Sequence, residues 1–530
     1  MRRVLESRVM ERQGKIAKAA GVMSIATLIS RILGFVRDMT LASFFGAAGT
    51  SDTFFVAFRI PNLLRELFAE GSMSAAFVPV LARVEADGGR EEATRLVRAS
   101  LTFMLMLVGG VCGLGALFAP QIVVAIAPGF LADPEKLALT VLLTRVMFPF
   151  LLFVSLAALV MGALNTRRVF FVPALASAVF NAVWIAAVPL LAGRVSPAVA
   201  AIAVGVAIGG AAQLLFQIPS FLRAGYSLRP SLRFGHPGLR QMGVLLVPAT
   251  FGMAVAQVNI FVSNILASYL PQGSITYLYY SMRLIQFPIG IFGVAMGMAV
   301  LPALAAHAAR GETGRVREDF SYALRLLFFI TVPAMAGLIA LRTPIVNLLF
   351  VRGRFDEIAA AGTAQALLYY ALGIWAVVGV RVVASTFYAL HDTRTPVRVG
   401  VAAMLVNVAL SLLLMGPLAH AGLALANACA SMTNFALLFF LLRRRLGRLE
   451  AGRIARSLLR TTVAASLMGI AAWALLRGQL WTTGGHTALK SALFAGTAAL
   501  CIGIYLAASK LLGSEELGSV IALVRRRVTR

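Results

Sequence analysis

Apolar runs separated by short polar loops make up most of this 530-residue chain. The runs lie near residues 21–47, 53–82, 99–127, 137–163, 170–192, 197–222, 241–270, 274–306, 320–341, 360–390, 397–416, 421–442, 457–476 and 487–511. Nearly all of them reach the roughly 20 residues that an α-helix needs to cross a bilayer. The pattern therefore predicts an all-α polytopic membrane protein with about 14 transmembrane helices.

Arginines and lysines are distributed unevenly between the loops. They are concentrated at both chain ends and in the loops after even-numbered runs, such as Arg443, Arg444 and Arg445 after the twelfth run. The loops after odd-numbered runs hold few of them. Because basic residues collect on the cytoplasmic side of a membrane protein, we expect both termini in the cytoplasm and an even number of spans.

The composition excludes several classes of protein. Hydrophobic residues make up 60% of the chain, charged residues only 13%, and the mean hydropathy is +0.87, which excludes a soluble enzyme. The net charge of +27 lies largely in the loops, so membrane topology explains it and no nucleic-acid partner is expected. Cys112, Cys429 and Cys501 are far apart and show neither metal-binding nor disulfide spacing. We therefore predict no metal and no cofactor.

Two passages of the chain recur in its second half. Residues 53–82 resemble residues 276–305, and residues 163–168 resemble residues 389–394. The offset covers six helices, so the two halves share one orientation, as in transporters with parallel repeats. This organisation predicts a basic segment 1–20, a first lobe 21–222, a second lobe 223–442, a basic linker 443–456, two extra helices in 457–511 and a basic tail 512–530.

Ionisable residues inside the apolar runs mark a candidate site. An unpaired charge at the bilayer centre costs at least about 2.5–3.5 kcal/mol, so such residues usually face a wet cavity. In the first, second and eighth runs they are Arg31, Arg37, Asp38, Asp52, Arg59, Arg65, Glu66, Glu70 and Arg283. Asp52, Arg59 and Glu66 follow one another at intervals of seven residues, so they lie along one face of a helix.

The positive members of this set predict an anionic ligand. Four deep arginines suit a diphosphate, because a guanidinium binds phosphate oxygens through paired hydrogen bonds and stays charged. They are Arg31, Arg37, Arg65 and Arg283. In the alternative, Arg37–Asp38 and Arg65–Glu66 pair locally and only hold helices together. Arg145, Arg325 and Arg381 lack such neighbours, and we interpret them as structural.

Several polar motifs resemble those of the MurJ/MviN lipid II flippase family. They are Ser30–Asp38, Asp52–Arg65, Phe68–Gly71, Ala76–Pro79, Ala127–Phe130, Arg283–Pro288 and Phe387–Leu390. This family belongs to the multidrug/oligosaccharidyl-lipid/polysaccharide exporter superfamily. The resemblance therefore implies two six-helix lobes around a central cavity, and two extra helices that form a groove for a polyprenyl tail.

The resemblance also implies a function. It implies a transporter without enzyme activity, a monomer in the bacterial inner membrane with contacts to cell-wall synthesis proteins. Its substrate would be lipid II, an undecaprenyl diphosphate carrying a disaccharide-pentapeptide, moved from the cytoplasmic to the periplasmic leaflet by alternating access during peptidoglycan synthesis. The family's functional positions carry over to Arg31, Arg37, Asp38, Asp52, Arg65 and Arg283. The four arginines would bind the headgroup, and Asp38, Asp52, Arg59 and Glu66 would orient them or form a gate.

Two departures from the family pattern bear on energetics. Met282 and Gln286 stand where some relatives have acidic residues, and the seventh, eleventh and twelfth runs offer no carboxylate, which argues against a sodium site. Three alternatives remain open. They are a flippase for another polyprenyl-diphosphate glycan, a drug/cation antiporter of the same superfamily, and a membrane enzyme acting on prenyl diphosphates. An antiporter for cationic drugs would need a cavity lined with carboxylates, and such an enzyme would need acidic metal ligands.

Overall fold

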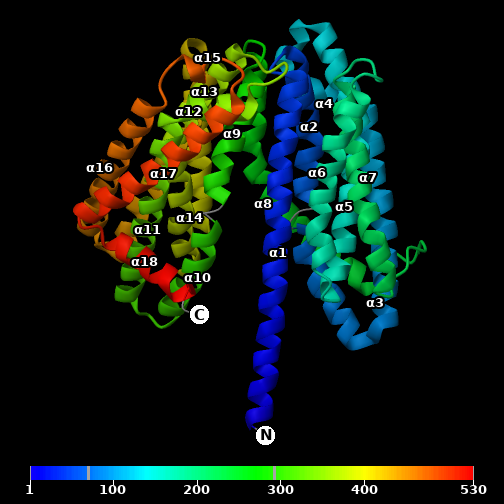
Figure 1. Cartoon of the computed structure of the whole chain (residues 1–530). Helices are drawn as coiled ribbons and strands as arrows, with labels where there is room; N and C mark the ends of the chain where they lie inside the picture. The colour runs from blue at the N-terminus through cyan, green and yellow to red at the C-terminus, as the bar shows by residue number, and fades with distance from the viewer. Residues whose placement is uncertain (1, 69–71, 291–293, 529–530) are drawn as a thin grey trace. The chain divides into compact units, whose positions relative to one another are not determined.

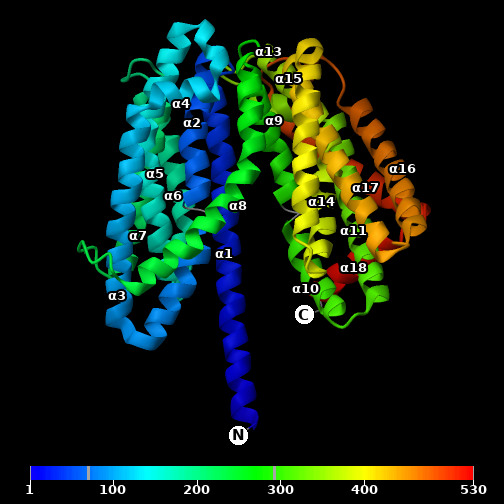
Figure 2. The ribbon, with the colours of Figure 1, turned by 180° about the vertical axis from the view of Figure 1, so that it is seen from behind.

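The computed structural model describes residues 2–68, 72–290 and 294–528; the ionisable Glu70 lies outside these ranges. Within them the chain is helical and holds no strand, which confirms the expected all-α class. Contacts divide the chain into two compact units, Met1–Tyr269 and Leu270–Arg530. Figures 1 and 2 show the helices of each unit from opposite sides.

The described residues of unit 1 form eight α-helices and one short 3-10 helix. They are α1 (Arg2–Phe45), α2 (Gly49–Phe68), α3 (Ser72–Leu117), α4 (Ala119–Ile126), η1 (Pro128–Ala132), α5 (Pro134–Thr166), α6 (Phe171–Leu191), α7 (Ala200–Arg223) and α8 (Pro237–Ser268). An aromatic cluster of Phe54, Phe150, Phe180 and Trp184 joins α2, α5 and α6 in its core. Asp133 starts α5 by accepting a hydrogen bond from the Lys136 amide at 3.0 Å, as an N-cap residue does.

Helix α8 packs against the other helices of unit 1, chiefly α3. Its last turn is fixed by η1, where the Gly129 amide donates to Ser268 Oγ at 3.0 Å. A Cβ at Gly129 would lie only 2.3 Å from the Ser268 carbonyl oxygen, so this approach requires glycine. The connection from α7 is held on α3 as well, because Arg98 Nε donates to the Arg229 carbonyl at 2.9 Å. The boundary between the two compact units therefore lies after α8, whereas the sequence repeat places α8 in the second lobe.

The described residues of unit 2 form a further set of helices. They are α9 (Ser274–Pro288), α10 (Val294–Ala309), α11 (Thr313–Ala340), α12 (Arg342–Phe350), α13 (Glu357–Leu372), α14 (Ile374–Ala389), α15 (Arg394–Leu446), α16 (Ala451–Leu475), η3 (Gln479–Trp481), α17 (Thr487–Leu511) and α18 (Glu515–Val528). Phe328, Trp375 and Phe435 form an aromatic cluster that joins α11, α14 and α15.

Each predicted apolar run is largely helical within the described residues, and α3 and α15 each contain parts of two runs. Among the described residues, nine helical segments are long and apolar enough to cross a membrane. One of them, Arg394–Leu446, contains two predicted runs, which meet at Ala419, where φ is 47° and ψ is −129°. The multi-pass character of the chain is therefore confirmed, whereas a total of 14 spans stays a prediction.

The last three helices of unit 2 form a sub-assembly on α11, seen along one flank of that unit in Figures 1 and 2. Tyr505 of α17 donates a hydrogen bond to the Phe329 carbonyl of α11 at 2.6 Å. Arg325 of α11 binds two carboxylates of α18, Glu515 at 2.8 Å and Glu516 at 2.9 Å. Ser457 of α16 donates to the same Glu516 oxygen at 3.0 Å. We call Arg325, Glu515, Glu516 and Ser457 the C-terminal latch.

Candidate functional site

Arg37 of α1 lies inside unit 1, with only 7% of its surface exposed. Its Nε and Nη2 donate to Asp38 Oδ1 at 3.0 and 2.7 Å, and its Nη1 donates to Asn181 Oδ1 at 3.1 Å. The guanidinium carbon also lies 4.5 Å from the centre of the Trp184 ring, within the range of a cation–π contact. Arg37 therefore ties α1 to α6.

Asn181 was not among the residues predicted for the site, yet it completes this contact. Its Nδ2 donates to the Ser30 carbonyl at 3.2 Å, one residue before Arg31. The α1 backbone is thus fixed to α6 on both sides of the stretch that carries Arg31. The sequence offered one signal for Asn181: it is a polar residue within an apolar run that matches Asn407 in the repeat.

Arg31 itself is exposed on α1. Among the described residues it makes no hydrogen bond or ion pair, whereas Arg37 uses three of its N–H groups within unit 1. The two residues are six positions apart, or about 9 Å along a helix. The structure therefore separates two arginines that the sequence treats alike: Arg31 is exposed, and Arg37 is buried and bonded to Asp38 and Asn181.

Asn62 connects Arg65 and Glu66 of α2. Arg65 Nε donates to Asn62 Oδ1 at 3.1 Å, and Asn62 Nδ2 donates to Glu66 Oε1 at 3.1 Å. The second Glu66 oxygen accepts a hydrogen bond from Gln257 of α8. All four side chains are half-buried. This network therefore ties α2 to α8 and fixes the direction of the Arg65 side chain.

Asp52 lies at the other end of α2, thirteen residues or about 20 Å from Arg65. It is buried, and its carboxylate lies 3.9 Å from Lys136 Nζ of α5. The same ammonium lies 4.1 Å from the centre of the Phe130 ring. Asp52 therefore belongs to a separate charge cluster near η1, and not to the neighbourhood of Arg65. Arg59, between the two ends, is half-buried.

Arg283 is the member of the predicted set that lies in unit 2, on α9. It is half-buried, and its Nη1 lies 3.5 Å from Gln286 Oε1, one turn further along the helix. Glutamine therefore contacts this arginine at a position where the family pattern includes an acidic residue. Because an amide carries no charge, this contact does not neutralise the guanidinium.

The three arginines interpreted as structural differ from one another. Arg145 Nε donates to the Ala116 carbonyl at 3.0 Å, near the end of α3, and Arg325 belongs to the C-terminal latch. These two contacts explain their presence at membrane depth. Arg381 of α14 is exposed and makes no hydrogen bond or ion pair among the described residues, so the structural interpretation has no contact to support it there.

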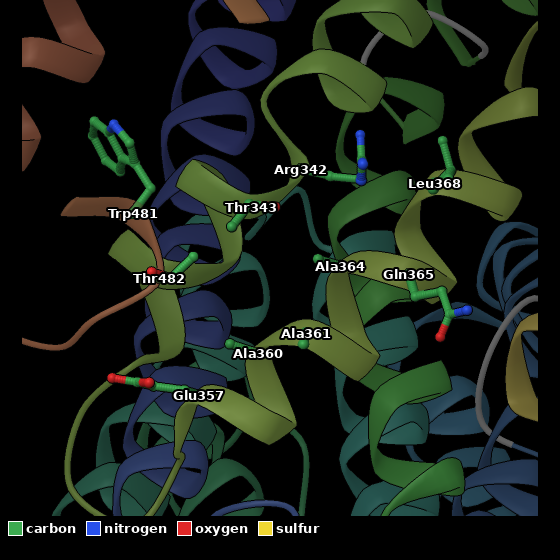
Figure 3. A pocket seen from close by; sticks show the side chains of 10 residues that line it. All are labelled: Arg342, Thr343, Glu357, Ala360, Ala361, Ala364, Gln365, Leu368, Trp481 and Thr482. Atoms are coloured by element: carbon green, nitrogen blue, oxygen red, sulfur yellow. The ribbon is translucent and has the colours of Figure 1, made fainter. Parts of the chain in front are cut away.

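Unit 2 also contains a cavity of about 360 Å³ between α12, α13 and η3 (Figure 3). Arg342 and Glu357 lie on opposite sides of it, and Trp481 and Thr482 approach from η3. A buried lysine supports this edge, since Lys490 donates to Asn347 Oδ1 at 2.8 Å. The cavity includes no residue of the predicted headgroup site.

The chain has the fold of the multidrug/oligosaccharide-lipid/polysaccharide transporters. The chain is similar to a solved inward-facing multidrug transporter of this superfamily, with a TM-score of 0.65 over 82% of this chain and 99% of that one at 15% identity. A solved lipid II flippase MurJ in an inward-closed conformation is more similar, with a TM-score of 0.76, 25% identity, and coverage of 92% and 98%.

Sequence comparison identifies the family within that class. The family model described as "Lipid II flippase MurJ" matches residues 41–490. A probable lipid II flippase MurJ of Vibrio cholerae is 35% identical over 432 residues, which cover 80% of this chain and 82% of the relative. The chain belongs to the MurJ lipid II flippase family. This membership confirms the expected family. It also confirms the prediction that the protein is a transporter and not an enzyme.

Proposed function

We propose that this chain moves lipid II from the cytoplasmic to the periplasmic leaflet of a bacterial inner membrane. The observation that carries this proposal is the match to the lipid II flippase family over residues 41–490, together with arginines inside the membrane-spanning helices. The transporters with the same fold supply a mechanism, in which one site is exposed to each side of the membrane in turn.

Three arginines of the predicted set are accessible enough to bind the diphosphate. Arg31 is exposed, and Arg65 and Arg283 are half-buried. A charge-assisted hydrogen bond to phosphate contributes about 1.5–3 kcal/mol, so each contact affects affinity by about ten- to a hundredfold. Arg37 takes a different role, in which its bonds to Asp38 and Asn181 hold the α1 segment that presents Arg31.

The half-buried network on α2 gives the transport cycle a point of control. Glu66 accepts hydrogen bonds from Asn62 on its own helix and from Gln257 on α8. Helix α8 is the last helix of unit 1 and leads directly into unit 2. We infer that headgroup binding at Arg65 rearranges this network, because Asn62 contacts both Arg65 and Glu66. Loss of the Glu66–Gln257 bond would then free α8 to move.

The same proposal assigns the topology and the last helices. Both termini lie in the cytoplasm, because basic residues dominate the corresponding loops. The polyprenyl tail stays in lipid along α16 and α17, while only the polar headgroup passes through the protein. A single chain suffices for this cycle, and contacts with cell-wall synthesis proteins would only deliver or remove lipid II.

Substrate selectivity in purified vesicles tests the proposal against its alternatives. The protein is reconstituted with lipid II, with a different polyprenyl-diphosphate glycan, or with a cationic drug, and transfer between leaflets or uptake is measured for each. We expect rapid transfer of lipid II and no uptake of the drug. Equal transfer of the other glycan lipid would show that the substrate is the broader class of polyprenyl-diphosphate glycans and not lipid II alone. Drug uptake would indicate an antiporter.

A further inference from the structure

The loop after the ninth apolar run, residues 342–359, is more basic than its position predicts. The loops after odd-numbered runs hold six basic residues, and three of them, Arg342, Arg352 and Arg354, are in this loop. By the positive-inside rule these loops are expected on the outer side of the membrane, where basic residues are sparse. Membrane topology therefore does not explain the three arginines, and another role is needed for them.

The cavity between α12, α13 and η3 lies at this loop (Figure 3). Its volume of about 360 Å³ falls within the range of small-molecule sites, roughly 300–1,000 Å³. Arg342 is the first residue of α12, and Glu357 is the first residue of α13 on the opposite side of the cavity. The α13 residues between them in Figure 3 are small, namely Ala360, Ala361 and Ala364. Short side chains here leave the space between the two charges open.

Arg342 and Glu357 carry opposite charges, yet they do not pair with each other. Arg342 is half-buried, and its Nη1 donates to the Ile339 carbonyl at 2.8 Å. A guanidinium has five N–H groups, so Arg342 keeps donors beyond this contact. Glu357 is exposed and makes no hydrogen bond or ion pair within the described ranges. Two opposite charges that line one cavity without touching can both be bound by a molecule placed between them.

The wall of the cavity on the η3 side is held by a buried lysine. Lys490, with only 2% of its surface exposed, donates to Asn347 Oδ1 at 2.8 Å and to the Thr483 carbonyl. Asn347 Nδ2 donates to the same carbonyl at 3.0 Å. Among the described residues Lys490 makes no ion pair, so its charge is not neutralised by a carboxylate in contact with it. The wall that carries Trp481 and Thr482 is therefore fixed on α12 and backed by a positive charge.

These charges select the kind of ligand. A purely anionic group such as a diphosphate would be repelled by Glu357, and a cation would be repelled by Arg342 and by the buried Lys490. A zwitterion avoids both penalties, because its carboxylate can bind the guanidinium through paired hydrogen bonds and its ammonium can bind Glu357. Gln365 is exposed and makes no hydrogen bond in the described part of the chain. Its amide can donate and accept, which suits a peptide group.

We propose that this cavity is an outer-side binding site for a zwitterionic peptide group, with the carboxylate on Arg342 and the ammonium on Glu357. This inference rests on the proposed function, which brings the peptide of lipid II to this side of the membrane. A peptide joined to a sugar through its amino end finishes in a carboxylate, and a diamino residue within it supplies the ammonium. Free cell-wall peptides outside the membrane share this chemistry. The cavity is too small for the whole headgroup and takes only the end of the peptide.

Binding of matched peptides tests the pair of charges. The full-length protein in phosphatidylcholine nanodiscs is titrated with radiolabelled Nα-acetyl-L-Lys-D-Ala-D-Ala, which carries one ammonium and one carboxylate. The Nα,Nε-diacetyl peptide lacks the ammonium, and the C-terminal amide lacks the carboxylate. We expect each of these two to bind about tenfold more weakly than the parent peptide. Equal affinity for the parent and either analogue, or no binding of the parent, would overturn the proposal.

Variants of the protein assign each charge to its residue. Glu357→Gln should weaken the parent peptide about tenfold and leave the diacetyl peptide unaffected, whereas Arg342→Gln should weaken the parent and leave the amide unaffected. Arg477→Gln removes an exposed arginine from the other loop at η3, outside the cavity lining, and should change none of the three affinities.

The Glu357 variant keeps this test independent of folding. Arg342 also binds the Ile339 carbonyl, so the thermal midpoint of Arg342→Gln is measured beside its affinities. Glu357 has no contact of this kind within the described ranges, so its variant should fold as the wild type does. An equal loss for all three peptides in Glu357→Gln, or no loss for any of them, would overturn the assignment.

Lipid II distinguishes the two sources of the peptide. If the cavity takes the peptide of lipid II, lysine-containing lipid II in the nanodiscs should displace the labelled peptide, and the same lipid without its peptide should not. Failure of both lipids to displace a peptide that binds as expected would assign the site to free peptides. Binding with this pattern in a protein that does not flip lipid II would refute the proposed function and leave the site standing. Flipping of lipid II without peptide binding would refute the site alone.

Discussion

The contacts of Arg37 predict that this residue, unlike Arg31, is needed for folding. Arg37→Ala removes three hydrogen bonds and a cation–π contact, and it removes the guanidinium partner of Asp38, whose surface is fully buried. Removing one member of a buried ion pair costs about 3–5 kcal/mol. Arg31→Ala removes an exposed side chain with no bonded partner among the described residues, and such changes stay within about 0.5 kcal/mol.

Thermal unfolding of the purified variants measures this difference. We expect the midpoint to fall by many degrees for Arg37→Ala and to stay at the wild-type value for Arg31→Ala, which should nevertheless lose transport. Arg37→Leu combined with Asp38→Asn should unfold at a higher temperature than Arg37→Leu alone, because the buried carboxylate charge is then absent. A wild-type midpoint for Arg37→Ala would refute the scaffold role. A folded Arg37→Ala protein that does not transport would indicate that Arg37 binds the headgroup, as the sequence predicts.

Four further outcomes follow from the structure. Gly129→Ala should lower the thermal midpoint, since the new Cβ would lie 2.3 Å from the Ser268 carbonyl oxygen; an unchanged midpoint would exclude tight docking of α8 on η1. The hydrogen bond from Arg325 lowers the pKa of Glu515 below its ordinary value of 4.5, so the latch contributes stability above that value and loses it as the pH falls through the lowered pKa. The protection of α18 amides relative to their intrinsic exchange rates should therefore fall only in acid, and a fall in this protection near neutral pH would contradict the assignment. Deletion from residue 457 onward should leave a folded core that flips short-tailed but not long-tailed lipid II, and equal loss for both would argue against a tail path on α16 and α17. Moving two charges across 100 mV is worth about 4.6 kcal/mol, so collapsing the membrane potential should stop net flipping while removing sodium should not, and strict sodium dependence at fixed potential would refute this.

The fold class could be predicted because the bilayer restricts the solutions. Apolar runs longer than about 20 residues must be helical there, since every backbone polar group has to be bonded within the segment. The packing of α8 could not be predicted in the same way. It depends on the meeting of Gly129 with Ser268 and of Glu66 with Gln257, which are contacts between residues far apart in the sequence.

The candidate site stays a prediction as a set of residues, and its geometry could not be predicted from the sequence. Charge inside an apolar run identified Arg31, Arg37 and Arg65, because burying charge is costly. The adjacent Asp38 allowed a local pair for Arg37 to be expected, but its contact with α6 could not be, since the partner Asn181 is 144 residues away. Arg325 could not be paired from sequence for the same reason, because its carboxylates lie in the C-terminal helix.

Headgroup exposure in living cells tests the central claim most directly. A bacterium depleted of its own lipid II flippase is supplied with this chain, and an externally added enzyme that cleaves lipid II reports how much headgroup has reached the outer leaflet. The account predicts that cleavage product returns to the level of the undepleted strain, and that a stably folded Arg283→Ala variant fails to restore it. Lipid II that stays protected from the enzyme, in cells where the wild-type chain is folded and inserted, would contradict the account.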